Sequence, residues 1–434
     1  MKTSTQAWVS IQKNQNQPDI SNWKIIRAKS QCLCERDYQR QWYNKFKNKK
    51  GRKNMKRILC IPDSFKGTLR SSQFITVIKD VFKIYLPDTE VIGIEVADGG
   101  EGTVDAFLSM LGGQKINALV SGPRFKKMEA FYGILPGQIA VIEMAACSGL
   151  PLVKDNPDPR TTTTFGVGEL MISAWEHGCR KLIIGLGGSS TNDGGCGAAA
   201  ALGIRFFDKE GRSFIPTGNT LIEIAKIDVT ETHVLLKDTE IVTMCDIDNP
   251  MFGPQGAAYV FSPQKGADPM SVVLLDEGLQ HLAKVIEWDL NLDVAHIPGS
   301  GAAGAMGGGM VAFFNSSLRS GIETILDTAH IDQQLQDCDL VITGEGKIDA
   351  QSLRGKVPIG VARHAKRAGV PVICLVGSIG EDIEAVYDKG ITAIFSINPQ
   401  PVDFSIARHK ALENLTITAS NLARLLAGIN RFNP

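Results

Sequence analysis

One pattern recurs along the chain and limits what it can fold into. A short apolar run is followed by a loop that mixes glycine with acidic, hydroxyl or lysine residues, and then by a helical stretch. "RILCIP" (57–62) leads into "DSFKGTLRS", and "LII" (182–184) leads into "GLGGSSTNDGGCG". Strand, glycine-rich loop and helix make up parallel α/β sheets, where ligands bind beyond the carboxyl ends of the strands. We therefore predict an α/β protein whose site is built from these loops.

The first unit reads as strand, helix, strand. Apolar residues at helical spacing predict a helix that begins near Ser71 or Ser72 and ends at Pro87. "VIGIEVA" (91–97) then predicts a second strand, parallel to the first. The apolar face of the helix comprises Phe74, Val77, Ile78, Val81, Phe82 and Tyr85.

The far end of the chain repeats this order. "DLVIT" (339–343) precedes "GEGKIDAQSLRGK", and Pro358 and Gly369 bracket a predicted helix before the strand "VPVICLVGS". The middle differs, because residues 126–145 read as two antiparallel strands joined by a Pro-Gly turn. We predict a Rossmann-like parallel-sheet domain (55–120 plus 301–434), interrupted by an inserted second α/β domain (121–300), with the active-site cleft between them.

Composition narrows the class of protein. The chain has 434 residues, 43% of them hydrophobic and 21% charged, as in globular proteins. No run of about eighteen apolar residues occurs, so we expect no membrane span. The nine cysteines form no Cys-x-x-Cys pair, which favours reduced thiols in a cytoplasmic protein.

Residues 1–54 differ from the rest in charge. They contain 13 Lys or Arg and 3 Asp or Glu, a net charge of +10 in a chain whose total is zero. They show no sustained helical period and no signal-peptide core. We expect Met55 to be the natural start and residues 1–54 to be an upstream extension or a disordered arm. A basic partner-binding or targeting arm is the alternative, and only such an arm would give a nucleic-acid role.

The loop after residue 184 allows three interpretations. Gly185–Ser190 resembles a dinucleotide fingerprint with Asp208 about twenty residues further on, which would indicate an NAD(P)-dependent oxidoreductase. Ser190 stands at the third glycine position, however, and Asp193 would repel a pyrophosphate. Binding of a nucleotide phosphate or a substrate is the favoured interpretation, and a purely structural glycine turn is the third.

Other loops offer charged groups with a structural alternative for each. Asp63 could act as a base or hold a metal and Lys66 could neutralise an anion, or the two could be an Asx-turn and a solvated lysine. Asp98 and Glu101 suit Mg²⁺, or they line a tight turn before a helix. Asp246 is a metal candidate, although an Asn-Pro turn fits slightly better.

The remaining loops add hydroxyls and one further acidic segment. Thr163 and Thr164 could contribute to an anion site, or one of them could cap a helix. Glu345, Asp349 and Lys356 lie among glycines in a loop that is not a Walker A motif. Lys265 is expected to be solvated. No histidine lies in these loops, so we expect neither a His-centred triad nor a zinc site.

Together these motifs resemble the bacterial type I glycerate kinase family. They occur in the expected order from about Met55 to near Ile394, as "IPDSFKGTL", "ADGGEGTVDA", "TTTTFGVGEL", "IIGLGGSSTNDGGCG", "CDIDNP", "FSPQKGA", "GSGAAGAMGGG" and "VITGEGKIDAQSLRGKVPIGVA". The resemblance implies transfer of the ATP γ-phosphoryl group to D-glycerate with Mg²⁺, giving 2-phosphoglycerate, on two α/β domains with the site in their cleft.

The resemblance and the chemistry of phosphoryl transfer together suggest roles. Lys66 and Lys356 are the predicted charge clamps, Asp193 is the first candidate for the general base, and Asp349 is the second. Asp98, Glu101 or Asp246 would hold Mg²⁺. We expect ATP and D-glycerate as the partners, no nucleic acid and no membrane, with a homodimer as an arrangement to test. The predicted binding set is Asp63, Ser64, Thr163, Thr164, Gly187, Gly188, Ser189, Ser190, Thr191, Asn192, Gly344, Glu345 and Gly346.

Overall fold

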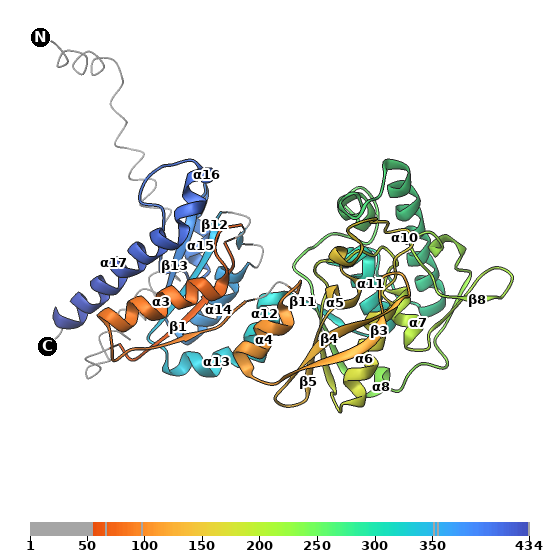
Figure 1. The fold of residues 1–434 in the computed structure, drawn as a ribbon, viewed down its shortest axis with the longest axis horizontal. Coiled ribbons are helices and arrows are strands. Elements are labelled where there is room, and N and C mark those ends of the chain that lie inside the picture. Colours follow the sequence, from red (N-terminus) through yellow and green to blue (C-terminus); the bar gives the residue numbers. More distant parts are fainter. Residues whose placement is uncertain (1–54, 66, 97–98, 350–351, 354–355, 433–434) are drawn as a thin grey trace, which may run out of the picture. The chain divides into compact units, whose positions relative to one another are not determined.

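The computed structural model describes residues 55–432 apart from 66, 97–98, 350–351 and 354–355. The chain divides after Lys53 into two units, and the second unit contains every described residue. The strands of the described residues form sheets of five, six and three strands (Figure 1). The predicted arm, residues 1–54, lies outside the described residues.

The five-stranded sheet is parallel throughout. Its strand order is β14-β13-β12-β1-β2, and every neighbouring pair is parallel. The strands come from two distant parts of the chain, so that Ile58 pairs with Leu340. The strands are β1 (Arg57–Pro62), β2 (Glu90–Gly93), β12 (Leu340–Ile348), β13 (Val372–Ile379) and β14 (Ala393–Ser396).

Strand β1 is buried on both faces because helices cover both faces of its sheet. Ile58 and Cys60 pack in one apolar cluster with α3 and α17, whereas Leu59 and Ile61 pack in another with α12 and α14. Figure 1 shows α3 and α17 lying beside each other. Two covered faces explain the uninterrupted apolar run in the sequence. The helices are α3 (Ser71–Tyr85), α12 (Gly321–Thr328), α13 (Ile331–Gln334), α14 (Val357–Ala368) and α17 (Ala411–Phe432).

The two predicted helices of this sheet are confirmed, with one correction. Helix α3 buries Phe74, Ile78, Val81 and Phe82 of its predicted apolar face. Its N-cap, however, is Arg70, while the Ser71 hydroxyl donates instead to the Pro62 carbonyl at 2.8 Å. Helix α14 carries Pro358 in its first turn and ends at the left-handed Gly369, as expected.

The six-stranded sheet is mixed. Its strand order is β11-β10-β6-β5-β4-β3, parallel from β11 to β5 and antiparallel from β5 to β3. The predicted antiparallel pair is β4 and β5, joined at a turn that contains Pro136 and Gly137. The strands are β3 (Gln114–Ser121), β4 (Lys127–Leu135), β5 (Ile139–Glu143), β6 (Lys181–Gly185), β10 (Glu240–Met244) and β11 (Ser317–Arg319).

A small antiparallel sheet and further helices complete the described elements. The three-stranded sheet has the order β8-β7-β9. It comprises β7 (Arg205–Phe207), β8 (Ser213–Phe214) and β9 (Lys226–Asp228). The helices are α4 (Thr103–Leu111), α5 (Ala145–Ser148), α6 (Phe165–Glu176), α7 (Cys196–Ala201), α8 (Leu235–Asp238), α9 (Ala257–Phe261), α10 (Pro269–Leu290), α11 (Ala302–Phe314), α15 (Glu384–Asp388) and α16 (Phe404–Ala407). The 3-10 turns are η1 (Leu150–Val153), η2 (Leu221–Glu223), η3 (Pro263–Lys265), η4 (Leu335–Asp337) and η6 (Arg408–Lys410).

The α/β class with parallel sheets is confirmed. Strands of the five-stranded sheet lie within 57–93 and 340–396, and strands of the six-stranded sheet lie within 114–319. The division into a domain of residues 55–120 plus 301–434 and an inserted domain of 121–300 stays a prediction. No helix of the described residues is long and apolar enough to cross a membrane.

Candidate active site

A cavity of about 1800 Å³ lies at the carboxyl ends of strands from both large sheets. Loops that follow β1, β6, β10 and β12 contribute to its lining, as the rule for open α/β sheets predicts. Ten of the predicted site residues line it, namely Asp63, Ser64, Glu101, Gly187, Gly188, Ser189, Asp246, Glu345, Gly346 and Lys356.

The other predicted residues take different places. Lys66 and Asp98 lie outside the described residues. The lining of the cavity does not include Thr163, Thr164, Ser190, Thr191, Asn192, Asp193, Gly344 or Asp349. The sequence therefore predicts the loops that line the cavity, but residues at the cavity and residues that hold the loops in place have the same local pattern.

The loop after β6 is pinned by its own backbone. The N–H of Gly187 donates to the Gly99 carbonyl at 2.9 Å, and the N–H of Ser190 donates to the Ser148 carbonyl at 2.9 Å. These two N–H groups are thus occupied, which corrects the prediction that both help to cradle an anion. Gly188 and Ser189 donate no backbone hydrogen bond within the described residues. Their N–H groups could therefore donate to an anion in the cavity.

Asp193 ties two helix starts together. Its Oδ2 accepts hydrogen bonds from the Thr164 N–H (2.7 Å), the Thr164 hydroxyl (2.9 Å) and the Gly197 N–H (3.3 Å). Its Oδ1 accepts one from the Gly195 N–H at 3.2 Å. Burial raises the pKa of this carboxyl above its ordinary value, although the hydrogen bonds act in the opposite direction. The carboxylate thus bridges the starts of α6 and α7, away from the cavity lining.

Thr163 and Thr164 also hold the starts of α6 and α7 in place. The Thr164 hydroxyl also accepts a hydrogen bond from the Ala198 N–H at 2.9 Å, and the Thr163 hydroxyl accepts one from the Phe165 N–H at 3.1 Å. Both residues are fully buried. Their polar atoms stabilise α6 and α7, so the helix-capping alternative describes them better than the anion-site prediction.

The glycine-rich start of α11 packs against this loop. A Cβ at Gly304 would collide with the Thr191 carbonyl, and Gly304 has a φ of 65°. Ala303 and Ala305 share this left-handed conformation, which is unfavourable for alanine. Ala303 also lines the cavity. The absence of a side chain at Gly304 thus allows α11 to approach this loop closely.

Lys265 lines the cavity, although its residue type and position did not predict this. Its side chain was expected to be solvated, yet only 3% of the residue is exposed. Nζ donates to the Ser189 hydroxyl and to the Thr191 carbonyl, both at 2.8 Å. Burial lowers the pKa of Lys265 to about 7, although the carboxylate of Asp193 acts to raise it. Gly266, with a φ of 97°, marks a turn after it, and a turn glycine does not indicate burial of the preceding lysine.

Glu345 and Lys356 form the charged pair on the side of the five-stranded sheet. Lys356 Nζ lies 3.3 Å from Glu345 Oε2, and the Glu345 side chain is 3% exposed. Glu345 Oε1 has no hydrogen-bond partner among the described residues. Burial raises the pKa of Glu345, and the Ser352 hydroxyl and Lys356 partly offset this effect. A buried carboxylate oxygen without a partner, beside a cavity, is suited to a ligand or a proton.

Two of the predicted metal ligands, Asp246 and Glu101, lie at the cavity, which is too few to coordinate a metal ion by protein groups alone. Asp246 Oδ1 accepts a hydrogen bond from the Gly321 N–H at 2.7 Å, and both Asp246 and Glu101 line the cavity. The described residues contain no group of three or more His, Cys, Asp or Glu that could hold a metal. Mg²⁺ is commonly held by one or two carboxylates and by substrate phosphates. Asp246 and Glu101 fit that smaller set.

Asp349 follows β12, the strand that contains Glu345, but it makes other contacts. Its Oδ2 pairs with Lys347 Nζ at 3.1 Å, and its backbone N–H donates to the Ser352 hydroxyl at 3.2 Å. It lies outside the cavity lining, so its predicted role as the second candidate base stays a prediction.

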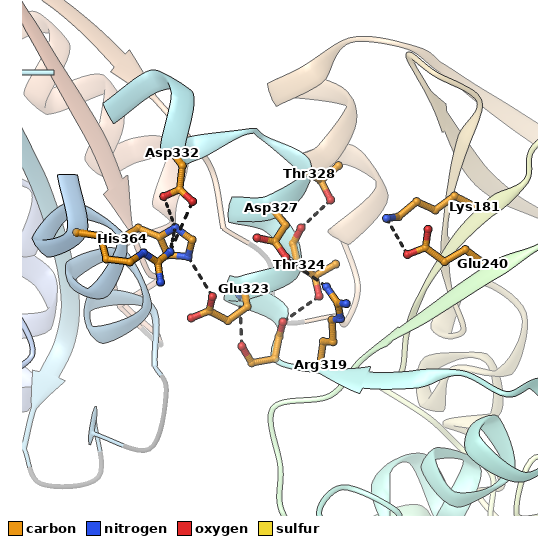
Figure 2. Close-up of polar contacts among 11 residues, drawn as sticks. Lys181, Glu240, Arg319, Glu323, Thr324, Asp327, Thr328, Asp332 and His364 are labelled. Carbon is orange, nitrogen blue, oxygen red and sulfur yellow. Dashed lines mark hydrogen bonds and ion pairs between the residues drawn. The ribbon is translucent and has the colours of Figure 1, made fainter. Parts of the chain in front are cut away.

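A histidine joins the two helices that begin at the cavity (Figure 2). Ser320 and Ile322 at the start of α12 line the cavity, as does Val357 at the start of α14. His364 of α14 contacts Glu323 Oε2 through Nε2 at 3.1 Å and Asp332 Oδ1 through Nδ1 at 2.7 Å. The bond to Glu323 raises the pKa of His364 above its ordinary value.

The dinucleotide interpretation finds no support in the topology. In a Rossmann unit, the strand that carries the ribose-binding acid belongs to the same sheet as the glycine-rich strand. Here β7, which precedes Asp208, belongs to the separate three-stranded sheet. Asp208 itself closes a surface turn, because its Oδ1 accepts from the N–H groups of Glu210 and Arg212 at 3.0 and 2.9 Å.

Parallel sheets with a cavity of lysines and carboxylates at their strand ends define an α/β enzyme that binds a small charged substrate. The chain belongs to the glycerate kinase family, whose model matches residues 58–427. It is 43% identical to "Glycerate kinase" of Bacillus cereus over 371 residues, 85% of this chain and 97% of that protein. It is also 43% identical to "Glycerate 2-kinase" of Escherichia coli K12 over 373 residues, 86% of this chain and 98% of that protein.

A solved structure agrees with this assignment. The crystal structure of a candidate glycerate kinase 2 from Salmonella typhimurium LT2 has a TM-score of 0.75 and 41% sequence identity. The match covers 87% of this chain and all of that one. The prediction of the family from eight ordered motifs is therefore confirmed.

Proposed function

We propose that this protein transfers the γ-phosphoryl group of ATP to a hydroxyl of D-glycerate, giving 2-phosphoglycerate. The observation that carries the proposal is the match to kinases over almost their whole length, including the Escherichia coli relative named glycerate 2-kinase. The cavity supports the proposal, since cationic groups, carboxylates and two N–H groups with no acceptor among the described residues lie at the same strand ends.

Phosphoryl transfer depends mainly on positioning and on neutralising charge spread over the phosphoryl oxygens. Lys356, and in the sequence prediction Lys66, would neutralise part of this charge. Asp246 and Glu101 would hold Mg²⁺, which screens the phosphate charge when bound. The N–H groups of Gly188 and Ser189 would orient an anionic group of a substrate.

A carboxylate near the attacking hydroxyl would accept its proton. Glu345 suits this role better than Asp193, because its Oε1 has no partner among the described residues and the residue lines the cavity. Its raised pKa also brings it closer to the working pH, which general base catalysis favours. We therefore propose Glu345 as the first candidate base, with Asp349 as the alternative.

The test is direct. Purified full-length protein is incubated with MgATP and D-glycerate, and the products are followed by ³¹P NMR. A phosphomonoester signal that matches 2-phosphoglycerate supports the proposal. Appearance of 3-phosphoglycerate would overturn the choice of hydroxyl, and a folded protein that gives no glycerate-dependent product would overturn the activity. Sedimentation of the same sample tests the predicted homodimer.

A further inference from the structure

The ammonium of Lys265 sits in an unusual environment for a buried cation. Its two hydrogen-bond partners, the Ser189 hydroxyl and the Thr191 carbonyl, carry no charge. Buried charges in proteins are normally paired with a group of opposite charge. Asp193 is the acid that acts on this ammonium through space, and its own oxygens already accept four hydrogen bonds from other donors.

The same place lines the cavity. Lys265, Ser189 and Gly188 all contribute to its lining. The ammonium donates to the Ser189 hydroxyl. The backbone N–H groups of Gly188 and Ser189, on the same loop, have no acceptor within the described residues. Two N–H groups, a hydroxyl and a cation on one short loop form a site for a single negative charge.

A carboxylate fits this site better than the phosphates of ATP do. One ammonium matches the single charge of a hydroxy-acid carboxylate, whereas a triphosphate carries several charges. The cavity holds further cations on the side of the five-stranded sheet, where Lys347 and Lys356 contribute to its lining. Glycerate has a carboxylate and two hydroxyls. If its carboxylate binds here, the hydroxyls remain free to accept the phosphoryl group.

We propose that Lys265 and Ser189 bind the substrate carboxylate, and that Lys265 takes up a proton when the carboxylate binds. This inference rests on the proposed function, because it concerns the acceptor substrate of that reaction. Lys265 would be protonated in the complex with the carboxylate. In the free enzyme above pH 7 it would be neutral, so that no unpaired cation is buried. Ser189 would be positioned by the ammonium and would contact the carboxylate itself.

The sign of the pH dependence follows from linkage. With a pKa of about 7, the lysine of the free enzyme is charged below that pH and neutral above it. A bound carboxylate stabilises the charged form and raises this pKa, so binding draws in a proton only above about pH 6. Glycerate affinity should be constant at lower pH and should weaken by up to about tenfold per pH unit above pH 7.

Other titratable groups near the cavity must be separated from this effect. Apart from Asp193, which faces the ammonium, and Asp268, which follows it and caps α10, they belong to the cavity lining. They are Asp63, Arg70, Glu95, Glu101, Cys245, Asp246, Asp248, Glu345, Lys347, Lys356 and Arg408. A variant at Lys265 that stays charged isolates its contribution from theirs.

The experiment has two parts. Calorimetric titration of the full-length protein with D-glycerate, in buffers of different ionisation enthalpy, counts the protons taken up between pH 6 and pH 8. We expect a value near zero at pH 6 that rises towards about one at pH 8. Steady-state kinetics with saturating MgATP then gives the KM for D-glycerate and kcat over the same pH range for wild type, Lys265→Met and Lys265→Arg. Lys284→Met, which replaces an exposed lysine of α10, is the control.

The expected result is specific to glycerate. Lys265→Met should raise the KM for D-glycerate roughly 10- to 100-fold, with a smaller change in the KM for ATP. Lys265→Arg should restore part of the affinity and remove its pH dependence above pH 7. The control should match wild type.

Three outcomes would overturn the inference. Glycerate binding without proton uptake at pH 8 in the wild type would do so without any variant, even if both variants failed to fold. Proton uptake on binding of ATP instead of glycerate would move the site to the nucleotide. An unchanged KM for D-glycerate in folded Lys265→Met would exclude the anchor. A wild type without kinase activity would count against the proposed function, and the proton count would then stand alone as the test of anion binding.

Discussion

The backbone N–H of Gly187 donates a hydrogen bond to the carbonyl oxygen of Gly99 at 2.9 Å. Two glycine-rich motifs that are far apart in the sequence therefore meet backbone to backbone. A Cβ on Gly187 would lie 2.5 Å from Gly100 Cα. Gly187 thus permits this contact, which leaves Gly188 and Ser189 as the residues of "GLGGSS" proposed to bind an anion.

This contact makes Gly187→Ala a destabilising substitution. The methyl group must displace backbone atoms, so we expect the free energy of unfolding to fall by about 1–3 kcal/mol, measured by urea denaturation. Gly428→Ala is the control, because a Cβ there meets no atom within 4 Å and alanine favours the helix. Equal stabilities of Gly187→Ala and wild type would show that the two loops do not pack as described.

Asp193→Asn should affect stability as well as activity. The amide can no longer accept the hydrogen bonds of both oxygens, and we expect a loss of about 2–4 kcal/mol in the free energy of unfolding. Asp155→Asn, at an exposed aspartate, should have no effect. The alternative role as general base predicts a fall in kcat of roughly 10²–10⁴ with unchanged stability, so denaturation and turnover measured on one sample separate the two roles.

Glu345→Gln should show the reverse behaviour. The isosteric amide cannot accept a proton, and we expect kcat to fall by roughly 10²–10⁴. Because burial raises the pKa of Glu345, its ionised form opposes folding at neutral pH, and the amide should leave stability equal or higher. Asp349→Asn is the matched comparison. Nearly full turnover in Glu345→Gln together with a large loss in Asp349→Asn would assign the proton to Asp349.

His364 should make stability depend on pH. Its raised pKa means that the folded state binds the proton more tightly than the unfolded state, so its contribution is complete below the ordinary pKa of about 6.5. That contribution is lost as the pH rises through the higher pKa of the folded state. The hydrogen bonds to His364 lower the pKa values of Glu323 and Asp332, and Arg363 and Arg367 lie beside these two carboxylates.

We therefore expect His364→Gln to be less stable than wild type by about 1 kcal/mol at pH 5.5 and by less at pH 9. Thermal denaturation across this range measures the difference. His409→Gln, at an exposed histidine, is the control. A difference that grows with pH would contradict the assignment of the proton to His364.

The sequence predicted the features that depend on neighbouring residues, such as helices and strand-end loops. It did not predict the contacts between residues far apart in the chain. The apolar face that contains Phe74 and Ile78 specifies α3 because a helix repeats every 3.6 residues. Parallel strands with charged loops at their carboxyl ends correctly predicted where the cavity would lie. Only the fold brings Lys265 to Ser189, across 76 positions of sequence.

The candidate site shows the same division. Glu345 and Lys356 are eleven positions apart, and one short stretch of sequence was enough to group them. Asp193 lay in the most conspicuous motif and was taken for a catalytic group, yet its carboxylate is occupied by donors from Thr164 and Gly197. A carboxylate that bridges two helix starts and one that faces a cavity have the same sequence signature, because glycines and hydroxyls surround both.

The pairing of β1 with β12 has a consequence for the order in which the protein can form during synthesis. Ile58 leaves the ribosome long before its partner Leu340 exists, whereas every strand of the six-stranded sheet has emerged by Arg319. Before β12 is synthesised, β2 is the only neighbouring strand of the sheet that can pair with β1. An unpaired strand edge can associate with other chains. The nascent chain must therefore keep its first strand soluble while most of the polypeptide is translated.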